Sequence, residues 1–412
     1  MYQILSCGSN GNYQLGLDND EDQSILQPAT FMLLDPNTNE LKPNTKLESK
    51  PIKITCGGNH TLVLFESGEV YGCGANENGQ IGCKEKEKEK EELELEAEQH
   101  HCFRIIHPPT PKGVWTDIAC SWECSYLVCD KKKVYSLGRG NKGELGLGLG
   151  VLSNSDINLG LLREFEYPVT KIKSSLNHVL LQTNDGKLYG WGSCRKGQLG
   201  DVLDPSLIKR GAIWQPVALH FTSEDNNLDM SSSTIDDFVL GRDYTVFLKR
   251  KKHGKLEIYG RANIDKDKLD MCISCDKDYK IEKIESMWSS IHVKINNEIK
   301  SYGVNTHGQL YNYKFPHSIE HLKDCYLFVV GSEHGLLLAD NKVFAWGWGE
   351  HGNCGSPNYA AKACSTHSPE TLLDDITFDY LNPLYTGQDK VHLIAGGCAT
   401  SWVVIESETE LD

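Results

Sequence analysis

The sequence predicts an all-β fold, a seven-bladed β-propeller in which the N-terminal and C-terminal strands share one blade. Three observations carry this prediction. A glycine-rich phrase recurs seven times, a strand-forming phrase recurs seven times ahead of it, and the two phrases stand in reverse order at the chain ends. Internal repetition on this scale is typical of propellers and of other arrays of small structural units.

The glycine-rich phrase is a strand that ends in glycine, followed by a polar turn and Gly-Gln-Leu-Gly or a variant of it. Glycine adopts positive φ in turns without steric cost, and its missing Cβ lets neighbouring blades approach closely. The Leu or Ile of each copy is therefore expected to be buried between blades. The copies are CGSNGNYQLG from Cys7, CGANENGQIG from Cys73, LGRGNKGELG from Leu137, WGSCRKGQLG from Trp191, YGVNTHGQLY from Tyr302, WGWGEHGNCG from Trp346 and the degenerate YGRANIDKDKL from Tyr259.

The second phrase consists of two extended segments around a tight turn. Apolar residues alternate in segments such as Thr61–Phe65, as the period-two packing of a strand requires. Together the two phrases supply the strands of one antiparallel blade. The copies are ITCGGNHTLVLF from Ile54, IACSWECSYLV from Ile118, IKSSLNHVLL from Ile172, FVLGRDYTVFL from Phe238, IESMWSSIHV from Ile284, FVVGSEHGLLL from Phe328 and LIAGGCATSWVVI from Leu393.

The order of the phrases predicts that the ring is closed. The chain begins with the glycine-rich phrase at Gln3–Gly16 and ends with the strand-forming phrase at Leu393–Ile405, so neither end holds a whole repeat. A blade shared by the two ends completes seven blades and removes the exposed sheet edges that an open stack leaves. An open solenoid is the competing architecture.

The length of 412 residues suits one propeller, which we expect to form a single domain over residues 1–412. The repeats are unevenly spaced, and the longer intervals predict insertions. One of them contains an alternating Glu/Lys tract at Lys84–Glu98, which we interpret as a solvated segment rather than a binding motif. The predicted insertions lie near 23–50, 84–111, 201–236 and 357–390.

Composition narrows the class of protein. The net charge of −15 argues against nonspecific nucleic-acid binding, which depends on Lys and Arg that neutralise phosphates. The chain has no apolar stretch of about 18 residues and no signal peptide at its start, so we expect no membrane association. The 15 cysteines lie mostly inside strand phrases, which predicts reduced thiols. These features favour a cytoplasmic protein and leave a nuclear one open.

Motifs of catalysis and of metal binding are weak or missing, so we predict no catalytic residues, no cofactor and no metal. Cys272 and Cys275 form a lone Cys-x-x-Cys without a second pair. The glycines near Gly138 resemble a phosphate loop, but they belong to the repeat and lack Gly-Lys-Ser/Thr. Histidines recur at one place in the strand-forming phrase, which favours a hydrogen-bonding turn residue over a catalytic base. They are His60, His178 and His334.

One copy of the glycine-rich phrase differs from the others. The last blade places Trp348 after the turn glycine, where other copies have Ser, Ala, Arg or Val, and Glu350 and His351 follow. Aromatic residues with charged neighbours on one rim are typical of protein–protein hot spots. Unusual strand-forming phrases nearby contribute Trp288, Glu333 and His334, whereas Trp402 fits the core equally well. We therefore predict a partner-binding surface formed by Trp288, Glu333, His334, Trp348, Glu350 and His351.

The paired phrases, above all GGNHTLVLFESGEVYGCGANENGQIG, resemble the repeats of the regulator of chromosome condensation family of seven-bladed propellers. The resemblance covers the chain outside the insertions. The runs WGWGEHGNCG, GSEHG, MWSSIH and GGCATSW further resemble a fungal branch of that family. The blade at Ile258–Leu269 departs from the pattern because it lacks Gly-Gln-Leu-Gly.

The resemblance implies a partner. The fungal branch forms a heterodimer with a small CSL-type zinc-finger metalloprotein, an electron carrier in diphthamide synthesis, and is linked through Elongator to tRNA wobble-uridine modification. The expected role is a non-catalytic regulatory scaffold, with Elongator contacted only indirectly and no direct contact with nucleic acid. The alternative is a guanine-nucleotide exchange factor for a small GTPase. That activity needs a protruding hairpin, and the insertion expected to supply it shows no hairpin signal.

Overall fold

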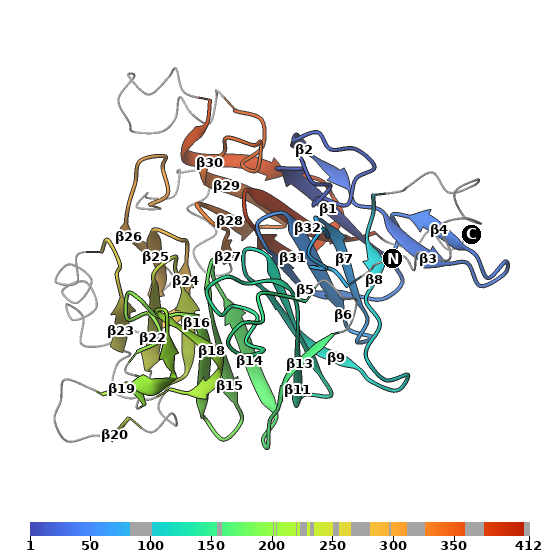
Figure 1. The fold of residues 1–412 in the computed structure, drawn as a ribbon. Helices are drawn as coiled ribbons and strands as arrows, with labels where there is room; N and C mark the ends of the chain where they lie inside the picture. The colour runs from blue at the N-terminus through green and yellow to red at the C-terminus, as the bar shows by residue number, and fades with distance from the viewer. Residues whose placement is uncertain are drawn as a thin grey trace.

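The computed structural model describes most of the chain, and its regular elements are almost all strands. Seven antiparallel sheets stand around a common axis (Figure 1). The first strands of the sheets contact one another in a closed ring, in the order β31, β5, β9, β14, β21, β24, β27 and back to β31. The described residues are 1–82, 101–154, 159–200, 202, 204–219, 221–222, 229–230, 235–249, 255–264, 281–295, 298–310, 326–358 and 375–407.

Each sheet is one blade, and the predicted seven-bladed propeller is confirmed. Given from the innermost strand outward, blade 1 is β31 (Lys390–Gly396), β32 (Thr400–Glu406), β1 (Tyr2–Gly8) and β2 (Gln23–Pro28), and blade 2 is β5 (Pro51–Cys56), β6 (His60–Phe65), β7 (Val70–Gly74) and β8 (Arg104–Ile105). Blade 3 is β9 (Trp115–Cys120), β10 (Cys124–Cys129) and β11 (Lys133–Arg139), which pairs with both β12 (Ser153–Asn154) and β13 (Gly160–Glu164). Blade 4 is β14 (Val169–Ser174), β15 (His178–Thr183), β16 (Leu188–Ser193), β18 (Ala212–Ala218) and β17 (Ile208–Lys209).

The remaining blades have three or four strands among the described residues. Blade 5 is β21 (Asp237–Leu240), β22 (Tyr244–Lys249) and β23 (Lys255–Gly260), blade 6 is β24 (Ile281–Ser286), β25 (Ser290–Ile295) and β26 (Glu298–Gly303), and blade 7 is β27 (Tyr326–Val330), β28 (His334–Ala339), β29 (Lys342–Trp348) and β30 (Thr377–Tyr385). Outside the blades lie the 3-10 helix η1 (Pro205–Leu207) and two hairpins, β3 (Phe31–Leu34) with β4 (Leu41–Asn44) and β19 (Phe221–Thr222) with β20 (Asp229–Met230).

Blade 1 closes the ring, as the order of the phrases predicts. Strand β1 pairs with β32 from Tyr2 opposite Glu406 to Gly8 opposite Thr400. The backbone amide of Ser407 also donates a hydrogen bond to the carbonyl of Met1 (3.0 Å). Because β1 lies between β32 and β2, the N-terminal segment is an interior strand of its sheet.

The repeated apolar residues form the core between blades. Leu15, Ile81, Leu145 and Leu199 of the glycine-rich phrases are buried, whereas Leu310 is half-buried. The indole of Trp191 is fully buried and donates to the carbonyl of Glu144 in the preceding blade (2.8 Å). Trp346 makes the equivalent bond to Gln309 (3.1 Å). Trp402 is also fully buried, which settles its place in the core.

The long intervals of the sequence contain strands as well as loops. The predicted insertions hold the outer strands β2, β8, β18 and β30 and both extra hairpins. Strand β2 is partly solvated and β8 is short, so these two lack the alternation that identifies a strand in sequence, whereas β18 and β30 are longer and largely buried. The Glu/Lys tract at Lys84–Glu98 and the Cys272–Cys275 pair lie outside the described residues.

The ten cysteines in the described part of the chain are free thiols, and most of them are buried. Within that same part, no helix has both the length and the apolar character needed to cross a membrane.

Candidate functional site

One face of the ring carries every candidate partner-binding residue that reaches the surface. It holds the turns between the first and second strands of the blades and the loops that follow the third strands, and we name it the loop face. In all seven blades the residue after the third-strand glycine donates its amide to the carbonyl of that turn. The donors are Ser9, Ala75, Arg139, Ser193, Arg261, Val304 and Trp348.

The recurring glycine makes this contact possible. Gly74 has a φ of 98°, and a Cβ at this position would overlap with the carbonyl oxygen of Asn59. Gly347 has a φ of 104°, and a Cβ there would overlap with the carbonyl of Glu333. Glycine therefore brings each loop against its turn, and the loop face becomes one continuous surface.

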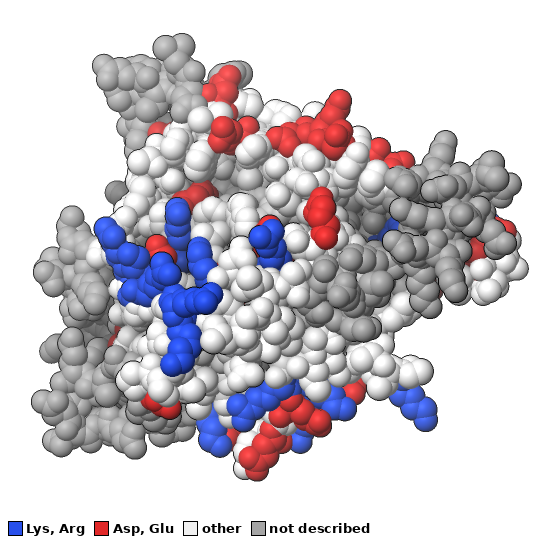
Figure 2. All heavy atoms as spheres, in the orientation of Figure 1, with Lys and Arg blue, Asp and Glu red and all other residues white. Residues whose placement is uncertain are grey.

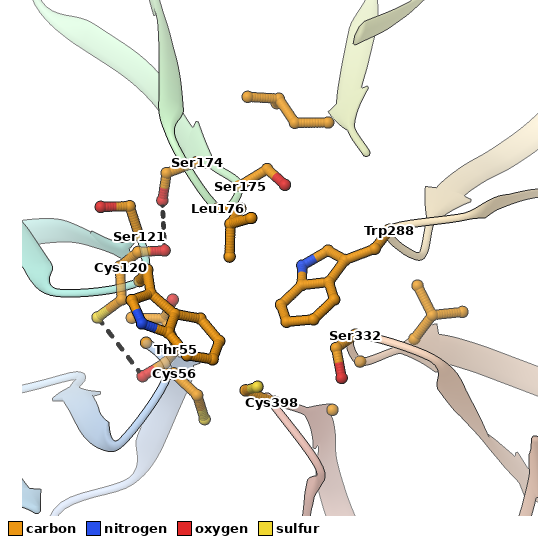
Figure 3. A pocket seen from close by; sticks show the side chains of 18 of the residues that line it. Thr55, Cys56, Cys120, Ser121, Ser174, Ser175, Leu176, Trp288, Ser332 and Cys398 are labelled. Carbon is orange, nitrogen blue, oxygen red and sulfur yellow. Dashed lines mark hydrogen bonds between the residues drawn. The ribbon is translucent and has the colours of Figure 1, made fainter. Parts of the chain in front are cut away.

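At the centre of the loop face, turns from all seven blades surround a depression, which we name the channel mouth. They enclose a pocket of about 180 Å³, into which Trp288 points (Figure 3). The indole rings of Trp288 in blade 6 and Trp122 in blade 3 lie 5.8 Å apart, with an angle of 51° between their planes. Trp122 is 41% exposed, so this aromatic pair is open to the solvent.

Backbone hydrogen bonds link the turns of successive blades around this mouth, and we name this series the turn relay. The amide of Arg242 donates to the carbonyl of Trp288 (3.1 Å), and the amide of Trp288 donates to the carbonyl of Ser332 (2.8 Å). Gly58 is linked to Trp122 and Trp122 to Leu176 in the same manner. The main chain of both tryptophans is therefore held on two sides, which lowers the backbone entropy that these turns would lose in binding.

A second pocket, of about 240 Å³, adjoins Trp288. It is lined by Arg242, Asp243, Tyr244, Arg261, Asn263, Trp288, Ser289 and Glu333. The Ser289 hydroxyl donates to the Glu333 carboxylate (2.6 Å), and burial raises the pKa of Glu333 despite this bond. Charged and aromatic groups thus share one opening, which suits an interacting side chain from another protein.

Trp348 lies at the outer side of Glu333. Its amide donates to the carbonyl of Glu333 (3.0 Å), and its half-buried ring stacks on His307 with centroids 4.6 Å apart. The buried Nε1 of Trp348 has no hydrogen-bond partner among the described residues. A donor that is buried without a partner destabilises the fold.

Glu350 and His351 lie farther out on the loop face. Glu350 is exposed, and His351 Nδ1 lies 2.7 Å from a carboxylate oxygen of Asp22 in blade 1. The contact joins blade 7 to the loop between β1 and β2. These two residues are therefore surface residues, but they lie at the rim rather than at the channel mouth.

The prediction that His334 belongs to the binding surface is wrong. His334 is 1% exposed, and its Nε2 lies 3.0 Å from the hydroxyl of Ser401 in blade 1. His60 and Ser125 make the same contact between blades 2 and 3 (2.9 Å), as do His178 and Thr245 between blades 4 and 5 (3.1 Å). This histidine position therefore joins adjacent blades, which agrees with the hydrogen-bonding interpretation of the repeat.

The structure thus brings Trp288, Glu333 and Trp348 together and places Glu350 and His351 beyond them. Sequence reasoning did not select Trp122, Arg242, Arg261 or His307 for this surface. Trp122 and Arg242 occupy the same turn position as Trp288, so comparison of the aligned turns could have identified them. Among the described residues no group of three His, Cys, Asp or Glu side chains is arranged to hold a metal ion.

Comparisons with known proteins agree with this architecture. The model of the RCC1-like domain family matches residues 3–403. An RCC1 repeat-containing protein of Schizosaccharomyces pombe is 28% identical over 419 residues, which cover 98% of this chain and 99% of that protein. The secretion-regulating guanine nucleotide exchange factor of Mus musculus is 24% identical over 392 residues, which cover 85% of this chain and 75% of that protein.

Solved structures show the same fold. Human WBSCR16 superposes with a TM-score of 0.67 at 14% identity and covers 99% of this chain and 100% of its own. Prp20p of Saccharomyces cerevisiae, described together with its binding to Gsp1p and histones, has a TM-score of 0.66 at 16% identity, with coverage of 99% and 92%. At these identities the similarity shows the fold alone.

Proposed function

Because the chain belongs to the RCC1-like domain family, we propose that it is a non-catalytic scaffold whose loop face binds a small CSL-type zinc-finger electron-carrier protein. Through that cytoplasmic heterodimer it would support diphthamide synthesis and, indirectly through Elongator, modification of the tRNA wobble uridine. The partner and the pathway come from the resemblance of WGWGEHGNCG, GSEHG, MWSSIH and GGCATSW to the fungal branch of the family.

The observation that carries the scaffold role is the position of Trp288. It faces Trp122 across the channel mouth, lines the pocket that contains Glu333, and is held on both sides by the turn relay. Large aromatic side chains that are pre-positioned on a rigid support are typical centres of protein interfaces. The geometry supports presentation of a surface to a macromolecule.

Binding measurements on purified proteins test this proposal. The Trp288→Ala/Trp348→Ala double variant is expected to lose at least about 2 kcal/mol per hot-spot residue, which is about 30-fold in affinity for each. The affinity for the recombinant CSL zinc-finger protein would be measured by calorimetry, and the melting temperature would confirm that the fold is kept. Tyr167→Ala, which removes an exposed aromatic ring ahead of β14 on the opposite face, is the matched control.

Two outcomes would contradict the proposal in different ways. If the intact chain shows no binding to the CSL protein, the proposed partner is wrong. If the double variant binds as well as the intact chain does, the partner contacts another part of the molecule.

Exchange of guanine nucleotides is the second candidate. Relatives described as guanine nucleotide exchange factors favour it, including a human RCC1-like G exchanging factor-like protein that is 30% identical over 220 residues, 53% of this chain and 44% of that protein. The sequence shows no hairpin signal in the insertion expected to supply the exchange hairpin, but the structure has two hairpins within insertions, β3–β4 and β19–β20. Release of fluorescent GDP from a panel of small GTPases tests this candidate. Acceleration by substoichiometric amounts of the chain would replace the scaffold proposal.

A further inference from the structure

Eight exposed basic residues gather in one part of the loop face. They come from the loops and turns of blades 3, 4 and 5, and Figure 2 shows Lys and Arg side chains concentrated over β16, β18, β22 and β23. We name this set the basic sector. Its members are Arg139, Lys142, Arg195, Lys196, Lys209, Arg210, Arg242 and Arg261.

Among the described residues, carboxylates offset the charge of the basic sector only at a distance, as Glu144 does for Lys142 and Glu333 does for Arg242. None of its eight side chains forms an ion pair with a carboxylate of the described residues. Some lysines elsewhere in the described part of the chain do form ion pairs, as in Lys53–Asp117 (2.6 Å) and Lys283–Glu285 (2.8 Å). Clustered cations repel one another, so an anionic group placed among them gains attraction from several of them at once.

The geometry holds part of this sector in place. The guanidinium of Arg195 donates to the backbone carbonyl of Arg210 (3.0 Å), which fixes the Arg195 side chain across the loop face. The loop of Arg195 and Lys196 also abuts Gly260 at the end of β23, so the cations of blades 4 and 5 adjoin. A rigid set of charges loses less conformational entropy on binding than free side chains do.

The basic sector continues into the candidate partner site. Arg242 and Arg261 line the same pocket as Trp288 and Glu333. One surface therefore combines an unpaired cationic area with aromatic rings at its inner edge. Interfaces use this combination, since charges steer and orient a partner while aromatic residues supply binding energy.

The opposite part of the loop face is acidic. Asp20, Glu21, Asp22 and Glu350 are exposed there, and Figure 2 shows Asp and Glu side chains along the edge near β2 and β30. With a net charge of −15, the rest of the molecule would repel an extended polyanion such as RNA. A compact protein with an acidic patch would be attracted by one side of the face and repelled by the other, and so would dock in one orientation.

We propose that the basic sector is the docking site for an acidic surface of the protein partner, whose adjoining residues then contact Trp288. This inference rests on the proposed scaffold function and extends it by naming the chemistry of the partner and its orientation on the loop face.

Charge reversal tests the proposal. The Arg195→Glu/Lys196→Glu/Arg242→Glu/Arg261→Glu variant is expected to lose at least about 100-fold in affinity for the CSL zinc-finger protein, with the loss in the association rate increasing as salt is lowered. The matched control is Lys131→Glu/Lys132→Glu/Lys342→Glu/Lys390→Glu. It makes the same change in net charge with exposed lysines of the opposite face and is expected to stay within about threefold of the intact chain.

The outcomes separate this inference from the function on which it rests. If the intact chain does not bind the CSL protein, the proposed function fails and the docking proposal fails with it. If the intact chain binds and the sector variant binds equally well, or if both variants weaken binding equally, only the docking proposal fails. Binding of a fluorescent single-stranded RNA is measured as well. If the intact chain binds this RNA tightly, and the sector variant loses RNA binding but still binds the CSL protein, the basic sector is a nucleic-acid site and the docking proposal fails.

Discussion

Deletion of residues 1–8 is expected to abolish the folded state at temperatures where the intact chain is folded. The deletion removes β1 from the interior of blade 1, which leaves β32 paired on one side only, with β31, and β2 without a sheet. It also removes Ile4 and Cys7, both with 0% exposure. Loss of each large buried side chain costs about 2–5 kcal/mol, and a domain has only about 5–15 kcal/mol of stability. Thermal unfolding followed by circular dichroism measures the effect.

A circular permutant is the control for this deletion. Ser407 is hydrogen-bonded to Met1, so a short linker can join the two ends, and new ends can be opened in the turn at Ser67–Gly68 on the opposite face. The permutant keeps every strand and is expected to melt close to the intact chain. If the deleted chain melts at the same temperature as the permutant, the shared blade does not hold the ring together.

Acid is expected to destabilise the propeller well before its carboxylates are protonated. Burial lowers the pKa of His60 and His334 to about 4 and the pKa of His178 and His292 to about 3. The unfolded chain takes up these protons near pH 6.5, whereas the folded chain resists them, so stability falls as the pH drops from about 6.5 towards 4. Four such groups give an upper limit of roughly 5 kcal/mol per pH unit.

Two buried carboxyl groups act in the opposite direction. Burial raises the pKa of Glu144 and Glu333, so the folded chain takes up these protons more readily than the unfolded chain does. The measured slope should therefore lie below the upper limit set by the histidines. Stability should still fall with falling pH wherever proton uptake by the four histidines exceeds that by the two carboxyl groups.

Denaturant unfolding between pH 5 and pH 7.5 checks this prediction. His178→Gln is expected to lower the slope of stability against pH by about 1.4 kcal/mol per unit, because the unfolded state then binds one proton fewer. His107→Gln removes an exposed histidine and serves as the control. An unchanged slope in His178→Gln would show that the buried histidines do not cause the acid sensitivity.

The fold could be predicted from the sequence because the blades repeat the same types of residue at equivalent positions. Glycines such as Gly74 and Gly347 are needed wherever a loop meets its turn, and leucines such as Leu199 are buried wherever blades meet. The outer strand β2 was not recognised because most of its residues face solvent, so its sequence resembles a loop. Strand β8 has only two residues and carries no pattern.

The candidate site was only partly predictable. Trp348 was visible because one copy of the repeat departs from the others, and the loop face does present it. The pairing of Trp122 with Trp288 was not visible, since the two residues belong to blades far apart in the chain. His334 follows Glu333 in an unusual phrase, but its position in the repeat matches that of His60, and that position is buried. The basic sector could not be predicted from the negative net charge, because the net charge of a chain does not show where its charged residues lie on the surface.

In the turn relay, main-chain hydrogen bonds support the turns of the loop face, whereas the side chains of these turns determine what the face can bind. Gly58, Trp122, Leu176, Arg242, Trp288 and Ser332 occupy equivalent turn places and are joined through amides and carbonyls, which every one of these residues possesses. These hydrogen bonds involve only the main chain, so they do not depend on which side chain stands at each of these places, although a Cβ at Gly58 would overlap with the ring of Trp122. One propeller can in this way acquire new binding properties by substitutions in its central turns, while its blades stay the same.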